Sequence, residues 1–331
     1  METKQIVGID VSKETFDAVF ENNSIHEVFS NSTKGFGLLV KWLLRHAGKG
    51  LSGVLVVMEH TGIYSLPLEK YLYGKHIAFS KVAGIKIKRS MGLVRGKSDA
   101  ADAGMIARYG AEKRKVLTAQ QPVQANVLRL KNLIALRDKM VRDRAGWIVR
   151  LSEQEQFLGL QGSDLIVKVQ KAIVKGLDAG IDKVNNEITA VIEGDSALSQ
   201  TYGLLVSIKG VGPVIAAYMI ALTDNFKNFA TWRQFACYSG IAPFPYESGK
   251  SIKGRTRVSN YANKKIKSLL HMAAMNAVKY NPEIKDYYEK RTSAGKNKMG
   301  TLNAIRCKIV ARMFAVIKRQ EPYKVEWLNA A

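Results

Sequence analysis

The sequence predicts a protein with an α/β domain at its N-terminal end and a mainly helical remainder. Three observations indicate this fold class: short apolar runs that end on acidic residues, a long charged helical stretch from Pro122, and a strongly basic last third. With 331 residues, 47% of them hydrophobic, the chain can build more than one core. We expect an α/β domain at 1–120, a helical arm at 121–198 and a helical domain at 199–331.

Strand-like and helix-like patterns place the elements of the first domain. A short apolar run ends on Asp10, and the run after the next polar turn is its expected hairpin partner. Five apolar residues precede Glu59, which is typical of a strand covered on both faces. In chain order, we expect strands at 5–11, 15–21, 25–30, 53–58 and 77–82, and helices at 34–47, 64–74 and 99–113.

Four acidic residues are placed where they could meet. Asp10 and Glu59 end two apolar runs, and Asp99 and Asp102 begin an Ala-rich helix that Ser98 can cap. Residues three apart on a helix share a face. Each acid alone is more often a turn, cap or helix-dipole residue. Four carboxylates together repel one another unless they bind a cation, and hard oxygen ligands favour Mg²⁺ or Mn²⁺. Such a site suits two-metal phosphoryl transfer.

Charge and cysteine content limit the class of protein. The net charge is +23, and residues 201–331 carry 22 basic and 7 acidic residues, which indicates a polyanionic partner. Cys237 and Cys307 lie far apart, so no CxxC zinc or redox motif exists. We see neither a signal peptide nor an apolar run long enough for a membrane span. We therefore expect a cytoplasmic protein, associated with the nucleoid if it is bacterial.

Two basic segments are candidates for nucleic-acid contacts. The segment from residue 81 to 97 is about equally expected to be a solvated loop or a loop that contacts the nucleic-acid backbone. In the second case the candidate contacts are Lys86, Lys88, Arg89, Arg95 and Lys97. Residues 250–267 hold seven basic residues and no acid, and a surface that is merely solvated usually mixes both signs. This pattern favours phosphate contacts through Lys250, Lys253, Arg255, Arg257, Lys264, Lys265 and Lys267.

The middle of the chain predicts a long helical arm. From Pro122, apolar residues follow a 3-4 spacing typical of a coiled coil, with Arg137 and Arg144 on the same seam. A second helical run covers about 163–193, and glycines near 159–162 could reverse the chain into a hairpin. Seam arginines weaken a simple dimer zipper. A helical linker and an oligomerisation arm are equally compatible with this pattern.

The last third predicts further helices and two turns. Lys209, Gly210 and Gly212 lie between two apolar segments, as in a helix-hairpin-helix turn, whose glycines and helix N-terminus can approach a phosphate. Ser239 precedes Gly240, which predicts a helix end or turn where a hydroxyl can be exposed. No nearby histidine offers a base, so a hydrolase triad is not indicated. Amphipathic helices are expected at about 259–280 and 301–319.

The combined motifs resemble a known family. The order of Asp10, Glu59 and the Asp99–Asp102 pair resembles the RuvC-like ribonuclease-H-type nuclease domain. With the segments at 208–213 and 235–243, it resembles the DEDD transposases of the insertion sequence one-ten family. This resemblance implies a RuvC-like domain, a coiled-coil arm and a helical transposase domain. It also implies a metal-binding tetrad and a covalent DNA link through Ser239.

The same resemblance implies partners and a reaction. It implies a noncoding bridge RNA that pairs with donor and target DNA, and a tetramer in which Ser239 of one subunit completes the metal site of another. The resulting hypothesis is an RNA-guided DNA recombinase. Two alternatives remain: a metal-dependent Holliday-junction endonuclease that uses water instead of serine, and a noncatalytic nucleic-acid-binding scaffold with strongly salt-dependent binding.

Overall fold

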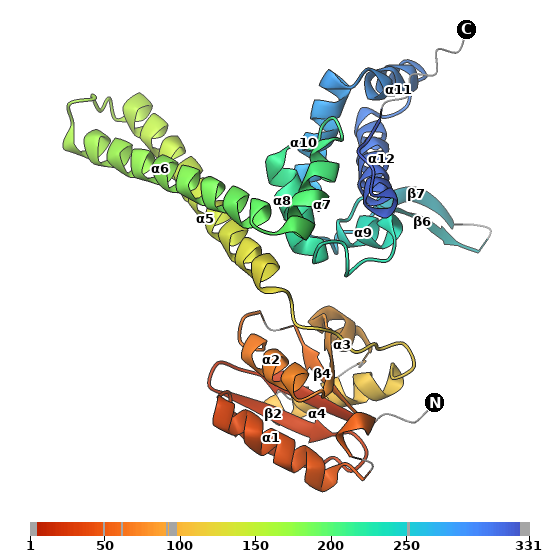
Figure 1. The fold of residues 1–331 in the computed structure, drawn as a ribbon. Helices are drawn as coiled ribbons and strands as arrows, with labels where there is room; N and C mark the ends of the chain where they lie inside the picture. Colours follow the sequence, from red (N-terminus) through yellow and green to blue (C-terminus); the bar gives the residue numbers. More distant parts are fainter. Residues whose placement is uncertain are drawn as a thin grey trace. The chain divides into compact units, whose positions relative to one another are not determined.

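The computed structural model divides into two compact units, Met1–Pro122 and Val123–Ala331. It describes residues 5–48, 50–60, 62–90, 92, 98–249 and 252–324. The first unit is a mixed α/β domain, and the second combines a long helical hairpin with a helical body (Figure 1). Within the described residues, no helix is both long and apolar enough to cross a membrane.

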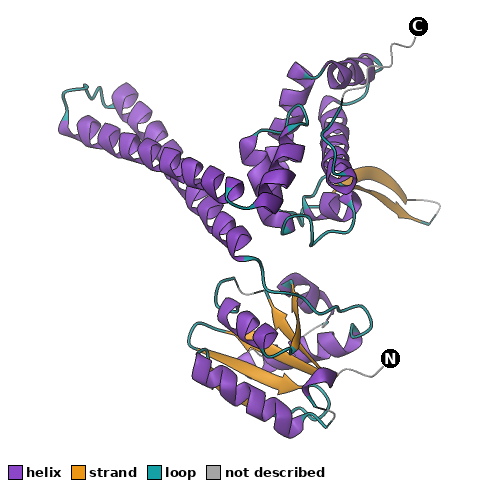
Figure 2. Cartoon of the chain, in the orientation of Figure 1, coloured by secondary structure: helices purple, strands orange, loops and turns teal. Residues whose placement is uncertain are grey.

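A five-stranded mixed sheet forms the centre of the N-terminal unit (Figure 2). The strand order is β3-β2-β1-β4-β5, with β1 antiparallel to β2 and parallel to β4. This layout agrees with the expected ribonuclease-H type, and all five expected strands form. Their bounds are β1 (Gln5–Val11), β2 (Thr15–Phe20), β3 (His26–Ser30), β4 (Val54–Glu59) and β5 (Ala78–Val82).

Helices cover both faces of this sheet. Phe36 and Leu39 of α1 and Leu68 of α2 pack with Ile9 of β1 on one face. Ile106 of α4 packs with strand residues of the opposite face. The helical elements of this unit are α1 (Thr33–His46), η1 (Leu51–Gly53), α2 (Leu66–Gly74), α3 (Gly84–Ser90) and α4 (Asp99–Glu112). We expected a loop at residues 81–97, and this was wrong for Gly84–Ser90, which form helix α3. The buried side chain of Ile87 anchors this helix on the domain.

Two long helices, α5 (Ala125–Phe157) and α6 (Leu165–Glu193), form an antiparallel hairpin. The seam arginines of α5 are paired across it. Arg137 Nε donates to the Asn185 side chain over 2.7 Å, and Arg144 pairs with Asp178. The two pairs lie seven residues apart on each helix, so together they favour one register between α5 and α6. At these two positions of the seam, polar pairs stand where a simple zipper would have apolar contacts, while Ile134 and Ile188 keep apolar packing elsewhere in the hairpin.

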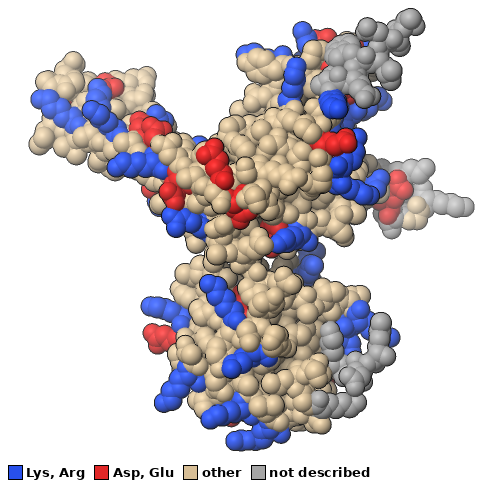
Figure 3. Space-filling model, viewed as in Figure 1, with Lys and Arg blue, Asp and Glu red and all other residues tan. Residues whose placement is uncertain are grey.

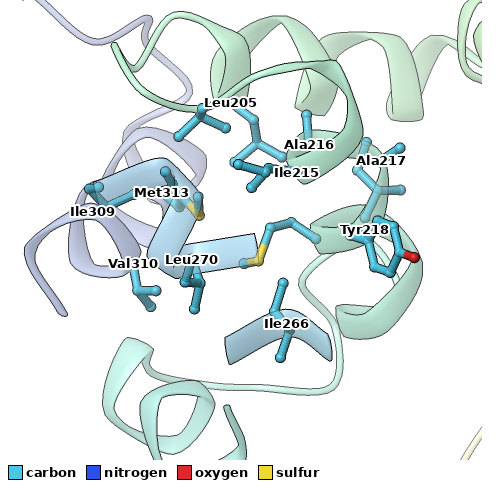
Figure 4. Packing of buried hydrophobic residues seen from close by; sticks show 14 of the residues in the cluster. Leu205, Ile215, Ala216, Ala217, Tyr218, Ile266, Leu270, Ile309, Val310 and Met313 are labelled. Carbon is cyan, nitrogen blue, oxygen red and sulfur yellow. The ribbon is translucent and has the colours of Figure 1, made fainter. Parts of the chain in front are cut away.

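The helical body packs around α8, whose residues are apolar on nearly every side. Such a helix must lie at the centre of a core. Ile215 and Ala216 of α8 lie in one buried cluster with residues from α7, α10 and α12 (Figure 4). The elements are α7 (Ser196–Val206), α8 (Pro213–Thr223), α9 (Trp232–Tyr238), β6 (Pro243–Ser248), β7 (Ile252–Val258), α10 (Lys264–Tyr280), α11 (Pro282–Ser293) and α12 (Lys298–Arg319).

Candidate functional site

Asp10 and Glu59 lie on the same face of the sheet. β1 and β4 are parallel, and the pair Ile9–Met58 immediately precedes the two acids. Side chains alternate between faces along a strand. Ile6 of β1 and Val57 of β4 pack with α4, so Asp10 and Glu59, each an even number of residues further on, face the same side.

Glycines allow α4 to lie directly on this face. A Cβ on Gly8 would lie 2.3 Å from both the Ala103 oxygen and the Ala107 nitrogen. A Cβ on Gly110 would lie 2.6 Å from a methyl carbon of Ile6. The two glycines therefore let the backbone of α4 approach β1 closely.

The first turn of α4 carries the other two acids of the tetrad. The Ser98 side chain caps the helix by accepting a hydrogen bond from the Ala101 amide over 3.2 Å. Asp99 is the exposed first residue of α4, and Asp102 is partly buried one turn later. Glu59, at the end of β4, lies against the start of α3. A Cβ on Gly84 would lie 1.9 Å from Glu59 Oε1, so this glycine leaves space for the Glu59 carboxylate.

The charges of the other three acids act on Asp10. Burial, followed by the charges of Asp102, Asp99 and Glu59, raises the pKa of Asp10 from 3.8 to about 6. Only a group of nearby carboxylates produces this pattern of like-charge causes. The structure therefore brings Glu59, Asp99 and Asp102 within electrostatic reach of Asp10.

Asp17 adds a fifth carboxylate that the sequence analysis missed. It lies directly opposite Asp10 in the β1–β2 ladder, so both side chains face α4. Asp17 is 8% exposed, and its Oδ1 lies 2.7 Å from His26 Nε2. Its charge also raises the pKa of Asp10. The hairpin register of 5–11 with 15–21 was the sequence signal that could have revealed it.

The donor set fits a divalent cation. Carboxylate oxygens are the ligands that Mg²⁺ and Mn²⁺ prefer, and a cation would relieve the repulsion that raises the pKa of Asp10. Among the residues that the structure describes, no three His, Cys, Asp or Glu side chains are close enough to hold one ion as they stand. The acids thus share a site without forming a closed coordination shell.

Ser239 lies in the C-terminal unit, at the C-cap of α9. The expectation of an exposed hydroxyl was wrong: Ser239 is 0% exposed, and its Oγ donates to the Ala236 carbonyl over 3.2 Å. Gly240 follows with φ +67°, and a Cβ there would lie 2.2 Å from the Cβ of Ala262. Ala262 therefore packs closely against Gly240, the residue that follows the buried serine.

The helix pair at 203–223 forms as α7 and α8, joined by a short turn. Lys209 is exposed in this turn. Gly210 has φ +100°, and a Cβ there would lie 2.8 Å from the Ala273 carbonyl oxygen, so this glycine serves packing against α10. Gly212 is the N-cap of α8, and a Cβ there would meet no atom within 4 Å.

The remaining candidate cations differ in their surroundings. Lys86, Lys88 and Arg89 are exposed on α3, as are Arg257 on β7 and Lys264 on α10, while Lys267 is partly buried. Lys265 Nζ forms an ion pair with Asp138 over 2.8 Å. On the face drawn in Figure 3, basic side chains are spread over the N-terminal unit. Arg95, Lys97, Lys250 and the side chains of Lys253 and Arg255 lie outside the described residues.

Comparison with known proteins identifies the class. A family model described as "Transposase", for DEDD transposases of the IS110 type, matches residues 7–155, which include the whole tetrad. A second, described as "Transposase IS116/IS110/IS902 family", matches residues 202–289. The chain is therefore a DNA-processing enzyme of the transposase class with a RuvC-like DEDD nuclease domain, a type that implies dependence on a divalent metal. It belongs to the IS110 family of transposases.

Individual proteins are similar to this chain over different shares of its length. The pilin gene-inverting protein of Moraxella lacunata is 26% identical over 97% of this chain and 98% of its own length. The 43.6 kDa protein of insertion element IS110 from Streptomyces coelicolor is 25% identical over 44% of this chain and 36% of its own length. Among solved structures, T. thermophilus RuvC in complex with a Holliday junction matches 35% of this chain and 99% of its own, with 12% identity and a TM-score of 0.26.

Proposed function

We propose that this transposase is an RNA-guided DNA recombinase that cuts, exchanges and rejoins strands. The observation that carries the proposal is the coupled group of carboxylates on the α4 face, in a chain of the transposase class. Asp10, Glu59, Asp99 and Asp102 would hold Mg²⁺ or Mn²⁺. A bound ion of this kind supplies Lewis-acid stabilisation of the charge that develops on the phosphate oxygens.

In the proposed reaction, Ser239 is the nucleophile. Its Oγ forms a bond to phosphorus while the bond from phosphorus to one strand oxygen breaks. The hydroxyl proton passes to solvent, and the released oxygen takes up a proton. The resulting phosphoserine link keeps the energy of the broken phosphodiester for rejoining. Since Ser239 is buried, the turn between α9 and β6 must open before this attack.

Two rival functions lead to different expectations. A Holliday-junction endonuclease would use water at the same carboxylates and would release free ends. A scaffold would bind nucleic acid without cutting it. The pilin gene-inverting relative, which aligns over nearly its whole length, favours recombination, because inverting a gene requires that cut ends be rejoined.

We further propose that the arm joins copies of the chain into a dimer of dimers. Within the proposed division into 1–120, 121–198 and 199–331, the arm would be a coiled-coil oligomerisation element. Its support is a set of apolar side chains at the hairpin tip, where Phe157 and Leu165 are each 75% exposed. Exposed apolar side chains gathered at one end of an element are typical of an interaction site.

Nucleic-acid contacts are proposed for the exposed basic residues. Lys209, with the glycines at 210 and 212, would contact backbone phosphate at a helix-hairpin-helix turn, and the cations at 86–97 and 250–267 would contact donor DNA, target DNA or the guide RNA. Lys265 is a weaker candidate, because its ion pair with Asp138 already engages its charge. Such contacts make binding strongly salt-dependent.

A covalent-adduct assay tests the proposal. The full chain is expressed with its native flanking DNA, which supplies any guide RNA, and is then mixed with its junction DNA and Mg²⁺ and denatured. The proposal expects protein-linked DNA that disappears in Ser239→Ala. Cleavage without an adduct would establish the water-using endonuclease. Tight binding without cleavage, when the co-purified RNA is shown by sequencing to be present, would establish the scaffold.

A further inference from the structure

A large cavity lies beside the Ser239 turn, within the C-terminal unit. It has a volume of about 1210 Å³ and is bounded by residues of α9, β7 and α12. Pockets for small molecules typically measure about 300–1,000 Å³, so this cavity can accommodate a longer ligand. Its walls include Ala236 and Cys237 before the serine and Ala242 and Pro243 after it.

The charges of this cavity have one sign. Among the lining residues that the structure describes, five are cations and none is a carboxylate. The cations come from four elements, and they are Arg233, Arg257, Lys267, Arg306 and Lys308. Because positive charge converges from several elements without acidic neighbours, the preferred ligand is an anion with more than one charge.

Arg306 is the strongest indication of such a ligand. It is 6% exposed, and its buried Nε makes no hydrogen bond within the described part of the chain. Its Nη2 lies 2.7 Å from His271 Nδ1, which must accept the bond because a guanidinium only donates. In the described part of the chain, no carboxylate pairs with this guanidinium. A buried charge without a counter-charge is costly, and a bound anion would remove that cost.

The aromatic residues of the cavity favour phosphate over bases as the contact. Arg233 lies over the ring of Trp232, 5.0 Å from its centroid, and Lys308 lies over Tyr287 at 4.3 Å. One face of each ring is therefore already covered by a cation, which leaves less room for base stacking. Guanidinium groups match phosphate oxygens in charge and geometry.

The cavity is also tied directly to the serine turn. The Asn303 side chain on α12 donates to the Ile241 carbonyl over 2.8 Å, and Cys307 Sγ donates to the same oxygen over 3.5 Å. Arg306 lies between these two residues on the same helix. A ligand held by Arg306 would thus be held next to the segment that carries Ser239.

We propose that this cavity binds the phosphodiester backbone of a DNA strand, with Arg306 as the buried anchor and Arg257 and Lys267 as further contacts. The choice of DNA rests on the proposed function, in which Ser239 attacks a DNA phosphodiester. The binding itself needs neither the metal nor the reaction.

The two cysteines of the chain report on this site, because both line the cavity. The full chain is mixed with a short single-stranded DNA in EDTA, treated with iodoacetamide and analysed by mass spectrometry. The proposal expects DNA to slow the alkylation of the exposed Cys237. DNA that binds without slowing this alkylation, or no DNA binding at all, would overturn it. Slowing by RNA of the same sequence, but not by DNA, would overturn the assignment to DNA.

Variants then test the anchor. Arg306→Gln should lower DNA affinity about tenfold or more and remove the protection of Cys237. Lys279→Gln, an exposed cation of α10 outside the cavity, is the matched control and should change affinity much less. If thermal unfolding shows that Arg306→Gln is misfolded, the double variant Arg257→Gln with Lys267→Gln takes its place. Unchanged affinity and protection in the folded variant would overturn the proposal.

This experiment separates the inference from the proposed function. Binding in EDTA with protection of Cys237, in a chain that forms no DNA adduct with Mg²⁺, would retain the site and reject serine recombination. Normal formation of the DNA adduct, together with unchanged DNA affinity in the cavity variants, would retain serine recombination and reject the cavity as a DNA-binding site.

Discussion

Gly8 of β1 and Ala107 of α4 meet backbone to backbone, because a Cβ on Gly8 would lie 2.3 Å from the Ala107 nitrogen. This contact fixes how closely α4 approaches the sheet. The first turn of α4 carries Asp99 and Asp102, so the same contact determines how close these acids come to Asp10. A residue without any chemical function therefore controls the geometry of the carboxylate site.

Gly8→Ala should destabilise the N-terminal unit by about 1–3 kcal/mol, the usual cost of overpacking a tight contact. Gly104→Ala is the matched control on α4, since its Cβ would meet no atom within 4 Å, and it should stabilise the helix by roughly 0.5–1 kcal/mol. Urea unfolding of both variants measures the two effects. Equal stability of the two would contradict the backbone contact.

Asp10→Asn should stabilise the metal-free protein. The folded state binds the Asp10 proton more tightly than the unfolded chain, because its pKa is raised from 3.8 to about 6. The stability that this proton gives is present at low pH and is lost as the pH rises through about 4 to 6. At pH 7 in EDTA, the variant should gain roughly 1–2 kcal/mol, after a reduction for solvent screening. Thermal or urea unfolding across this pH range is the measurement, and an unchanged pH profile would count against the raised pKa.

Mg²⁺ or Mn²⁺ should raise the melting temperature of the native chain, because a ligand that binds only the folded state stabilises it. Asp102→Asn should abolish most of this rise. Glu112→Gln, at the far end of the same helix, removes one negative charge and should leave the rise unchanged. Calorimetry with and without EDTA provides the comparison, and a similar loss in both variants would indicate a general charge effect instead of a site.

Phe157→Glu with Leu165→Glu should reduce self-association of the chain, since both apolar side chains are 75% exposed at the arm tip. Light scattering during size-exclusion chromatography gives the mass of the particle. Gln161→Glu, in the loop between the two helices, is the control for added charge. An unchanged mass in the double variant would show that the tip does not join the copies.

The sequence predicted most of the first unit because its signals were local. The apolar run from Gln5 and the cap at Ser98 depend on neighbouring residues alone, and both formed as expected. Helix α3 was missed because its only buried residue is Ile87 in a strongly basic stretch. The hairpin of β6 and β7 and helix α11 were also missed, since their patterns are short or polar.

Features that depend on long-range packing could not be predicted in this way. Asp17 faces Asp10 only because of the strand register, and the residue packed against Gly240, next to Ser239, is Ala262, more than twenty residues away. The pairing of Arg144 with Asp178 likewise requires the hairpin. In each case, the fold determines which distant residue makes the contact, and the neighbouring sequence does not indicate it.

The burial of Ser239 has a consequence for a mobile element that lives inside its host's chromosome. In the proposed function, a protein of this charge would also meet host DNA at sites where a break would harm both host and element. If Ser239 is the nucleophile, as proposed, its buried hydroxyl could not attack DNA during such encounters. In the proposed reaction, the opening of one turn would separate harmless contact from committed strand exchange, and the element's safety would rest on how seldom that turn opens.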